Sequence, residues 1–105
     1  MKTGYEGLRP TFNIKNGSNI NNIWYSRLKM NSGKNHLCEK PLDLITKIIE
    51  TSSNKGDIVL DCFMGSGTTA LACIETERNY LGCELDPEYW RIANDRIEKR
   101  KNVLL

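Results

Sequence analysis

The chain has 105 residues, enough for one domain with a modest core, because a chain of this length buries only about two thirds of its unfolded surface. Its net charge of +2 is too weakly basic to indicate a nucleic-acid-binding surface by itself. No apolar run approaches the length of a transmembrane helix and the first residues lack a signal-peptide core, so we expect a cytoplasmic protein with no membrane partner.

The N-terminal part of the chain is polar and rich in glycine and asparagine. Residues 1–22 carry no sustained hydrophobic period, and we expect them to form a loop with one short strand near residues 11–15. Residues 23–29, IWYSRLK, favour an extended segment. Trp24 and Tyr25 within it could stack on bases, but packing explains them more simply.

Two helices are predicted by apolar faces that follow a proline. Pro41 suits the first position of a helix that ends near residues 51–54. Pro87 opens the last helix, with Asp86 as a candidate N-cap, and the charged residues 98–101 end it with basic side chains that suit the helix dipole. The apolar faces consist of Leu42, Leu44, Ile45, Ile48 and Ile49 in the first helix and Tyr89, Trp90, Ile92, Ala93 and Ile97 in the last.

A strand, a glycine turn and a helix are predicted between these two helices, in the run IVLDCFMGSGTTA at residues 58–70. Its apolar start is typical of a buried strand, and Gly65 and Gly67 permit a tight turn that a ligand can approach closely. Residues 68–77 suit a helix. We expect a second strand to end at Glu84, where a carboxylate can accept both hydroxyls of a ribose. The pattern therefore predicts a nucleoside-cofactor site in an α/β fold.

Asp61, the last residue of the first predicted strand, discriminates between the cofactors that use such a turn. Dinucleotides and nucleoside triphosphates place phosphates on the backbone N–H groups of the turn, where a carboxylate would repel them. S-adenosylmethionine has no phosphate, and its sulfonium and ammonium groups are attracted to an acidic strand end. The sequence also has no GKS or GKT after the glycines, which excludes the phosphate-binding loop of nucleoside triphosphatases. We therefore predict S-adenosyl-L-methionine as the cofactor, and a dinucleotide-binding fragment is disfavoured.

The cysteines have no metal-binding spacing. Cys38, Cys62, Cys73 and Cys83 form no CxxC pair and His36 is the only histidine, so we predict no metal site. Cys73 falls in a predicted helix, and Cys62 and Cys83 fall at neighbouring strand ends, where small buried thiols are common. We expect reduced, structural cysteines.

Three segments of the sequence resemble motifs of the DNA amino-methyltransferases, which methylate adenine N6 or cytosine N4. DCFMGSGTTA and GCELDPEYWRIANDRI look like the cofactor-binding motifs of that family. HLCEKPLDLITKII, at residues 36–49, is similar to the His-Pro-Thr-x-Lys-Pro motif of the family and the helix that follows it. The order of the three segments resembles the permuted classes of the family, in which the catalytic strand comes earlier in the chain. The resemblance covers the chain from about residue 20 to about residue 100.

The resemblance implies a partial Rossmann-like fold of S-adenosylmethionine-dependent methyltransferases, an α/β fold with an incomplete parallel sheet flanked by helices. Residues 36–105 would form the half-domain that binds S-adenosylmethionine, and residues 1–35 an extended or loop segment. The candidate cofactor-binding residues are Cys38, Lys40, Pro41, Asp61, Phe63, Gly65, Ser66, Gly67, Thr68, Glu84 and Asp86.

Several of these residues have a second, structural interpretation. Lys40 is either a surface lysine or part of the cofactor pocket, and Phe63 is either a core residue or an aromatic that packs near the cofactor. Asp86 can cap a helix, contact the adenosine, or do both. Cys38 stands where the family has a threonine, and the lost hydroxyl removes a hydrogen bond to the cofactor's carboxylate worth about 1 to 2 kcal/mol. Leu37 and Cys62 both stand where the family has proline.

The catalytic motif of the family is not present in this sequence. That motif is Asp, Asn or Ser followed by Pro-Pro and an aromatic residue, on a loop that holds the amine of a flipped base. The prolines here are Pro10, Pro41 and Pro87, and none is next to another. We therefore assign no catalytic residue and expect the chain to be inactive without a complementary catalytic segment. We expect that segment before Met1 and the natural C-terminus at Leu105.

The resemblance implies the cofactor-binding segment of a site-specific DNA methyltransferase of the restriction-modification type, with DNA as the partner of the complete enzyme. The alternative is a stand-alone, non-catalytic module that binds S-adenosylmethionine, or a remnant of a methyltransferase gene. Without its catalytic neighbour, the strand before the glycine turn would have a free edge. We therefore expect a homo-oligomer or a complementary catalytic polypeptide.

Overall fold

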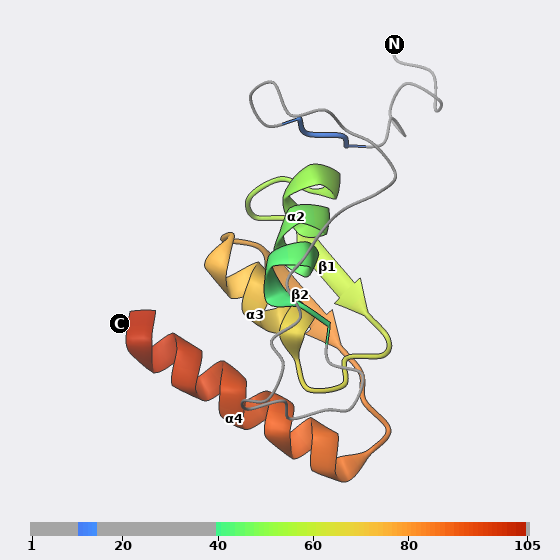
Figure 1. Ribbon diagram of the computed structural model, residues 1–105, viewed down its shortest axis with the longest axis vertical. Coiled ribbons are helices and arrows are strands. Elements are labelled where there is room, and N and C mark those ends of the chain that lie inside the picture. Colours follow the sequence, from blue (N-terminus) through green and yellow to red (C-terminus); the bar gives the residue numbers. More distant parts are fainter. Residues whose placement is uncertain (1–10, 15–39, 105) are drawn as a thin grey trace.

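The computed structural model describes residues 11–14 and 40–104 of the chain. Within them, three helices and two strands follow one another in the order α2, β1, α3, β2, α4 (Figure 1). Their bounds are Leu42–Ser52 for α2, Ile58–Asp61 for β1, Thr68–Glu75 for α3, Asn79–Gly82 for β2 and Pro87–Leu104 for α4. The extended segment expected at residues 23–29 lies outside the described residues, and so do residues 36–39, which include Cys38.

β1 and β2 form a parallel pair, as the succession of strand, turn and helix predicts. Ile58 lies beside Asn79 and Asp61 beside Gly82, so the strands are paired along their full length. α3 makes the crossover between them, which is the kind of connection that parallel strands require. Within the described residues the sheet consists of these two strands alone, and the predicted incomplete parallel sheet is confirmed.

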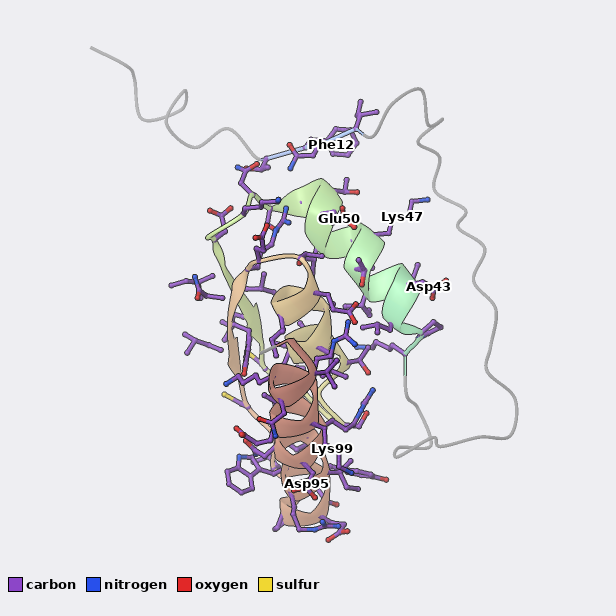
Figure 2. The ribbon with its side chains drawn as sticks, turned by 90° about the vertical axis from the view of Figure 1, so that its left-hand side faces the viewer. Phe12, Asp43, Lys47, Glu50, Asp95 and Lys99 are labelled. Carbon is purple, nitrogen blue, oxygen red and sulfur yellow. The ribbon has the colours of Figure 1, made fainter. Side chains whose placement is uncertain are left out.

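All three helices lie on the same side of the strands. Figure 2 shows the strands edge-on, with α2, α3 and α4 on one side of them. Two clusters of buried side chains make this packing. One contains Ile49 of α2 and Ala72 and Cys73 of α3, against Val59 and Tyr80 of the sheet. The other joins α3 to α4 through Ala70, Leu71 and Ile97.

The ends of α2 and α3 are fastened together by Arg78. α3 ends at Glu75 rather than at the predicted Glu77, because Glu77 takes a left-handed φ of 61° that no helix continues. The Arg78 backbone N–H then donates to the Cys73 carbonyl at 2.8 Å. Its guanidinium donates to the Ser53 hydroxyl at 3.1 Å and carbonyl at 2.8 Å, at the end of α2.

The predicted helix starts are close to those observed. Pro41 is extended, with ψ of 131°, and is the residue before α2 rather than its first residue; its carbonyl accepts the Ile45 N–H at 3.2 Å. Asp86 caps α4 as expected, because its Oδ1 accepts the Glu88 N–H at 2.8 Å. α4 continues to Leu104, past the predicted end at residues 98–101.

Residues 11–14 form no strand, contrary to the expectation for residues 11–15. They run along the C-terminal end of α2 instead (Figure 1). The Asn13 backbone N–H donates to the Thr51 carbonyl at 2.7 Å, and its side-chain amide donates to the Glu50 and Ser53 carbonyls at 3.0 and 2.7 Å. These bonds satisfy carbonyls that the end of a helix leaves without partners.

The cysteines differ from the expectation in one respect. Cys62, Cys73 and Cys83 are free thiols, as predicted, but only Cys73 is buried. Cys62 and Cys83 directly follow β1 and β2 and are exposed there. None of the helices in residues 40–104 is both long enough and apolar enough to cross a membrane.

Candidate cofactor site

The glycine turn joins β1 to α3 at the edge where both strands end. Gly65 and Gly67 have φ of 54° and 86°, in the left-handed region that favours glycine. The turn is fastened to the chain after β2, because the Met64 N–H donates to the Cys83 carbonyl at 2.9 Å. The carboxyl ends of parallel strands are the usual place for a ligand in such sheets.

Glu84 lies beyond the end of β2, which stops at Gly82 rather than at Glu84 itself. Its Oε2 accepts the Gly65 N–H at 2.7 Å and its Oε1 accepts the Asp86 N–H at 3.1 Å. The carboxylate therefore holds the glycine turn in place. A carboxylate has about four lone-pair sites, so acceptor capacity remains for the hydroxyls of a ribose.

Asp61 also has a structural role that the sequence pattern did not predict. Its Oδ1 accepts the Phe63 N–H at 3.0 Å and its Oδ2 accepts the Thr69 hydroxyl at 2.6 Å. These bonds tie the end of β1 to the first turn of α3. The carboxylate is half-buried and faces the glycine turn from the strand side, which keeps negative charge beside the site.

Arg96 of α4 supports the turn from the other side, and sequence reasoning missed it. Its Nη1 donates to the Ser66 carbonyl at 2.8 Å and to the Ser66 hydroxyl at 2.9 Å. Ser66 is buried, so this guanidinium supplies hydrogen bonds that water would otherwise have to supply. Arg96 follows the buried Ala93 by one helical turn, and that spacing is the signal that could have found it.

Gly67 is required for packing as well as for its backbone conformation. A Cβ on Gly67 would lie 3.0 Å from the Cβ of Ala93, closer than ordinary contact. The absence of a side chain at residue 67 therefore brings α4 against the turn. This packing explains Gly67 without any ligand, whereas the sequence pattern predicted a close approach of a ligand to the turn. Thr68, the first residue of α3, is buried beside it.

The remaining candidate residues differ in their surroundings. Phe63 is 84% exposed, which rules out its interpretation as a core residue and leaves the aromatic ring free to contact a ligand. Asp86 caps α4, so its structural interpretation is confirmed. Lys40 is exposed and Pro41 half-buried at the start of α2. The structure brings together the turn, Asp61, Glu84 and Asp86, and Cys38 lies outside the described residues.

Cys73 is buried in the core, in one cluster with Ile49 and Ala72. Burial raises the pKa of its thiol above the ordinary value of 9.0, Asp61 adds to the rise, and the nearby Arg78 partly opposes it. The thiol is therefore neutral at pH 7, and a neutral buried thiol is a poor nucleophile. The described residues contain no group of three or more His, Cys, Asp and Glu side chains that could hold a metal ion.

Together the fold and the site define an α/β unit of the kind that binds a nucleoside cofactor at the carboxyl edge of parallel strands. A profile of the N6/N4 methyltransferase family, described as DNA methylase, matches residues 2–95. The chain belongs to this family.

Curated relatives agree with the family assignment. The type II methyltransferase M1.MboII of Moraxella bovis is 54% identical over 59 residues, which cover 56% of this chain and 23% of that protein. M.BglI of Bacillus subtilis is 42% identical over 76 residues, covering 72% of this chain and 22% of M.BglI. The DNA adenine methyltransferase YhdJ of Escherichia coli is 40% identical over 80 residues, covering 73% of this chain and 27% of YhdJ. The chain thus spans only about a quarter of the length of these proteins.

Solved structures share the fold. The crystal structure of M1.HpyAVI in complex with S-adenosylmethionine superposes with a TM-score of 0.76 at 39% identity, covering 90% of this chain and 45% of M1.HpyAVI. The PvuII DNA methyltransferase, which is cytosine-N4-specific, superposes with a TM-score of 0.57 at 28% identity, covering 67% of this chain and 27% of that enzyme.

Proposed function

We propose that this chain is the S-adenosylmethionine-binding part of a site-specific DNA methyltransferase that modifies adenine N6 or cytosine N4. The proposal rests chiefly on one observation: the Glu84 carboxylate accepts the Gly65 N–H at 2.7 Å, so the acidic residue after β2 and the glycine turn after β1 form one unit. Membership of the DNA methylase family supports the same conclusion.

The residues present fit this cofactor. Glu84 retains lone pairs for the two ribose hydroxyls, and the exposed ring of Phe63 is available to pack against an apolar or aromatic group. Asp61 places a negative charge where a sulfonium and an ammonium would be favoured. The start of α3 offers backbone N–H groups and the positive end of the helix dipole to a carboxylate.

Bound S-adenosylmethionine would supply the methyl group for the amine of a base. The described residues would hold the cofactor and fix its orientation, which is the part of catalysis that depends on proximity. We assign the loop that holds the base to another segment or polypeptide, because this sequence has no Pro-Pro pair. The activity would take place in the cytoplasm, on DNA as the substrate of the complete enzyme.

A graft into a related enzyme tests this function. YhdJ is named as a DNA adenine methyltransferase, so its matched segment can be replaced by this chain and the hybrid assayed for methyl transfer from radiolabelled S-adenosylmethionine to DNA. We expect methylation by the hybrid, a strong decrease in the hybrid with Glu84→Ala, and none by this chain alone. A folded hybrid that binds DNA but neither binds S-adenosylmethionine nor transfers methyl groups would contradict the proposal.

The competing interpretation, a stand-alone module without catalysis, gives a different result. Such a module would bind S-adenosylmethionine but would not restore methylation in the hybrid.

A further inference from the structure

One face of the two-stranded sheet is apolar and exposed. Ile58 and Leu60 of β1 are 68% and 63% exposed, and Leu81 of β2 is 61% exposed. In the parallel register Leu60 lies beside Leu81, so the three side chains share one face. We call this group, Ile58, Leu60 and Leu81, the open sheet face.

The opposite face of the same strands is covered. Val59 and Tyr80 alternate with the residues of the open sheet face and pack against the helices. Figure 2 shows the helices gathered on that side of the strands, while the other side carries side chains directed into open space. Parallel sheets occur almost entirely with both faces covered, so a bare apolar face marks a site for another element.

β1 also has the character of an inner strand. Its residues Ile58, Val59 and Leu60 form a continuous apolar run, which is typical of a strand with neighbours on both sides. The Asp57 and Asp61 carbonyls accept N–H groups from the chain of β2 at 2.8 and 3.0 Å. The alternate residues, 58 and 60, therefore direct their N–H and C=O groups away from β2, where the described residues provide no strand.

β2 is the less suitable of the two strands for further pairing. It begins with Asn79 and ends with Gly82, and such residues are depleted in sheet interiors. The free edge of β1 and the open sheet face are therefore parts of one surface, with hydrogen-bonding groups along its edge and aliphatic side chains on its face.

The length of the relatives indicates what occupies this surface. The chain superposes on 45% of M1.HpyAVI, so more than half of that fold lies outside the matched part. We propose that the open sheet face and the free edge of β1 bind a polypeptide that carries the rest of the methylase sheet, with one strand beside β1 and an apolar element on the face. This inference rests on the proposed function, because it identifies the partner with the catalytic part.

Co-expression with a defined partner tests the inference. The probe is the part of M1.HpyAVI that the chain does not match, produced with the full chain described here. We expect a one-to-one complex by light scattering. Hydrogen exchange at the amides of residues 58 and 60 should slow at least about tenfold in the complex, because these N–H groups gain strand partners.

Charged variants separate an interface from a general effect on folding. Leu60→Lys and Leu81→Lys should leave the melting temperature of the isolated chain nearly unchanged, because both side chains are already exposed. In the complex each should weaken association at least about tenfold. Val103→Lys is the matched control, since Val103 is 74% exposed at the end of α4, and it should not affect association.

Three results would overturn the inference: no complex when both polypeptides are folded and soluble, a complex that survives Leu60→Lys with Leu81→Lys, or a homodimer of this chain through the open sheet face. S-adenosylmethionine binding by the chain is measured in the same samples. Binding without a complex would reject this inference alone, whereas a complex without binding would reject the proposed function.

Discussion

Replacing Glu84 is the most informative change, because its carboxylate serves both the turn and the proposed ligand. In the free protein it accepts the Gly65 N–H at 2.7 Å and the Asp86 N–H at 3.1 Å. Glu84→Ala removes both bonds from a half-buried position, which we expect to cost about 2 kcal/mol of unfolding free energy, or roughly 10 °C in Tm. Circular dichroism during thermal unfolding measures this part.

The effect of Glu84→Ala on the ligand is larger than its effect on the fold. Two hydrogen bonds from ribose hydroxyls to a charged acceptor are worth about 1.5 kcal/mol each, so their loss should raise the Kd for S-adenosylmethionine about 100-fold. Glu84→Gln keeps one acceptor oxygen, and we expect a rise of about tenfold. Calorimetry at a temperature where each variant is folded gives both values. A lowered Tm with an unchanged Kd would show that Glu84 holds the turn and does not bind the ribose.

Three further changes test the supports of the site. Gly67→Ala should lower the free energy of unfolding by about 2 kcal/mol or more, because φ is 86° and the new Cβ meets Ala93. The control Gly56→Ala has φ of 87° but open space, so it should cost only about 1 kcal/mol, and urea unfolding measures both variants. Arg96→Met leaves the buried Ser66 carbonyl without its donor and should cost about 1 to 3 kcal/mol, and a Tm equal to that of the wild type would refute the support of the turn. The raised pKa of Cys73 means that its contribution to stability is complete below pH 9.0, where the unfolded thiol is also protonated, and is lost as the pH rises through the folded pKa. The free energy of unfolding in urea should therefore fall less between about pH 7 and about pH 10 in Cys73→Ala than in the wild type. Equal decreases in the two proteins would exclude this effect.

Local patterns predicted the elements that position the site. The apolar run at residues 58–60 lies in β1, but the strand is not buried as predicted, because Ile58 and Leu60 are exposed. The glycines take the left-handed conformations of a tight turn, and Pro87 with Asp86 marks the start of α4. Each of these depends on residues close together in the sequence, where backbone sterics and capping leave few alternatives. The starts of the strands and helices could therefore be predicted from the sequence alone.

Contacts between residues far apart in the sequence could not be predicted from such local patterns. The spacing from Ala93 places Arg96 on the packed face of α4, but no local pattern identifies Ser66 as its acceptor. Nothing near Glu84 indicates that it accepts the Gly65 N–H before any ligand does. The exposure of Cys62 was also predicted wrongly, because burial at a strand end depends on which elements cover the sheet. These features follow from packing, which the sequence pattern does not encode locally.

Calorimetric titration of the purified chain with S-adenosylmethionine, and separately with NAD⁺, tests the central claim most directly. An acidic site that holds a free ribose and a cationic group should bind one S-adenosylmethionine per chain and give no saturable heat with NAD⁺, because Asp61 repels the pyrophosphate. Binding of NAD⁺ in preference to S-adenosylmethionine, or no saturable heat with either ligand from the folded chain, would contradict the account.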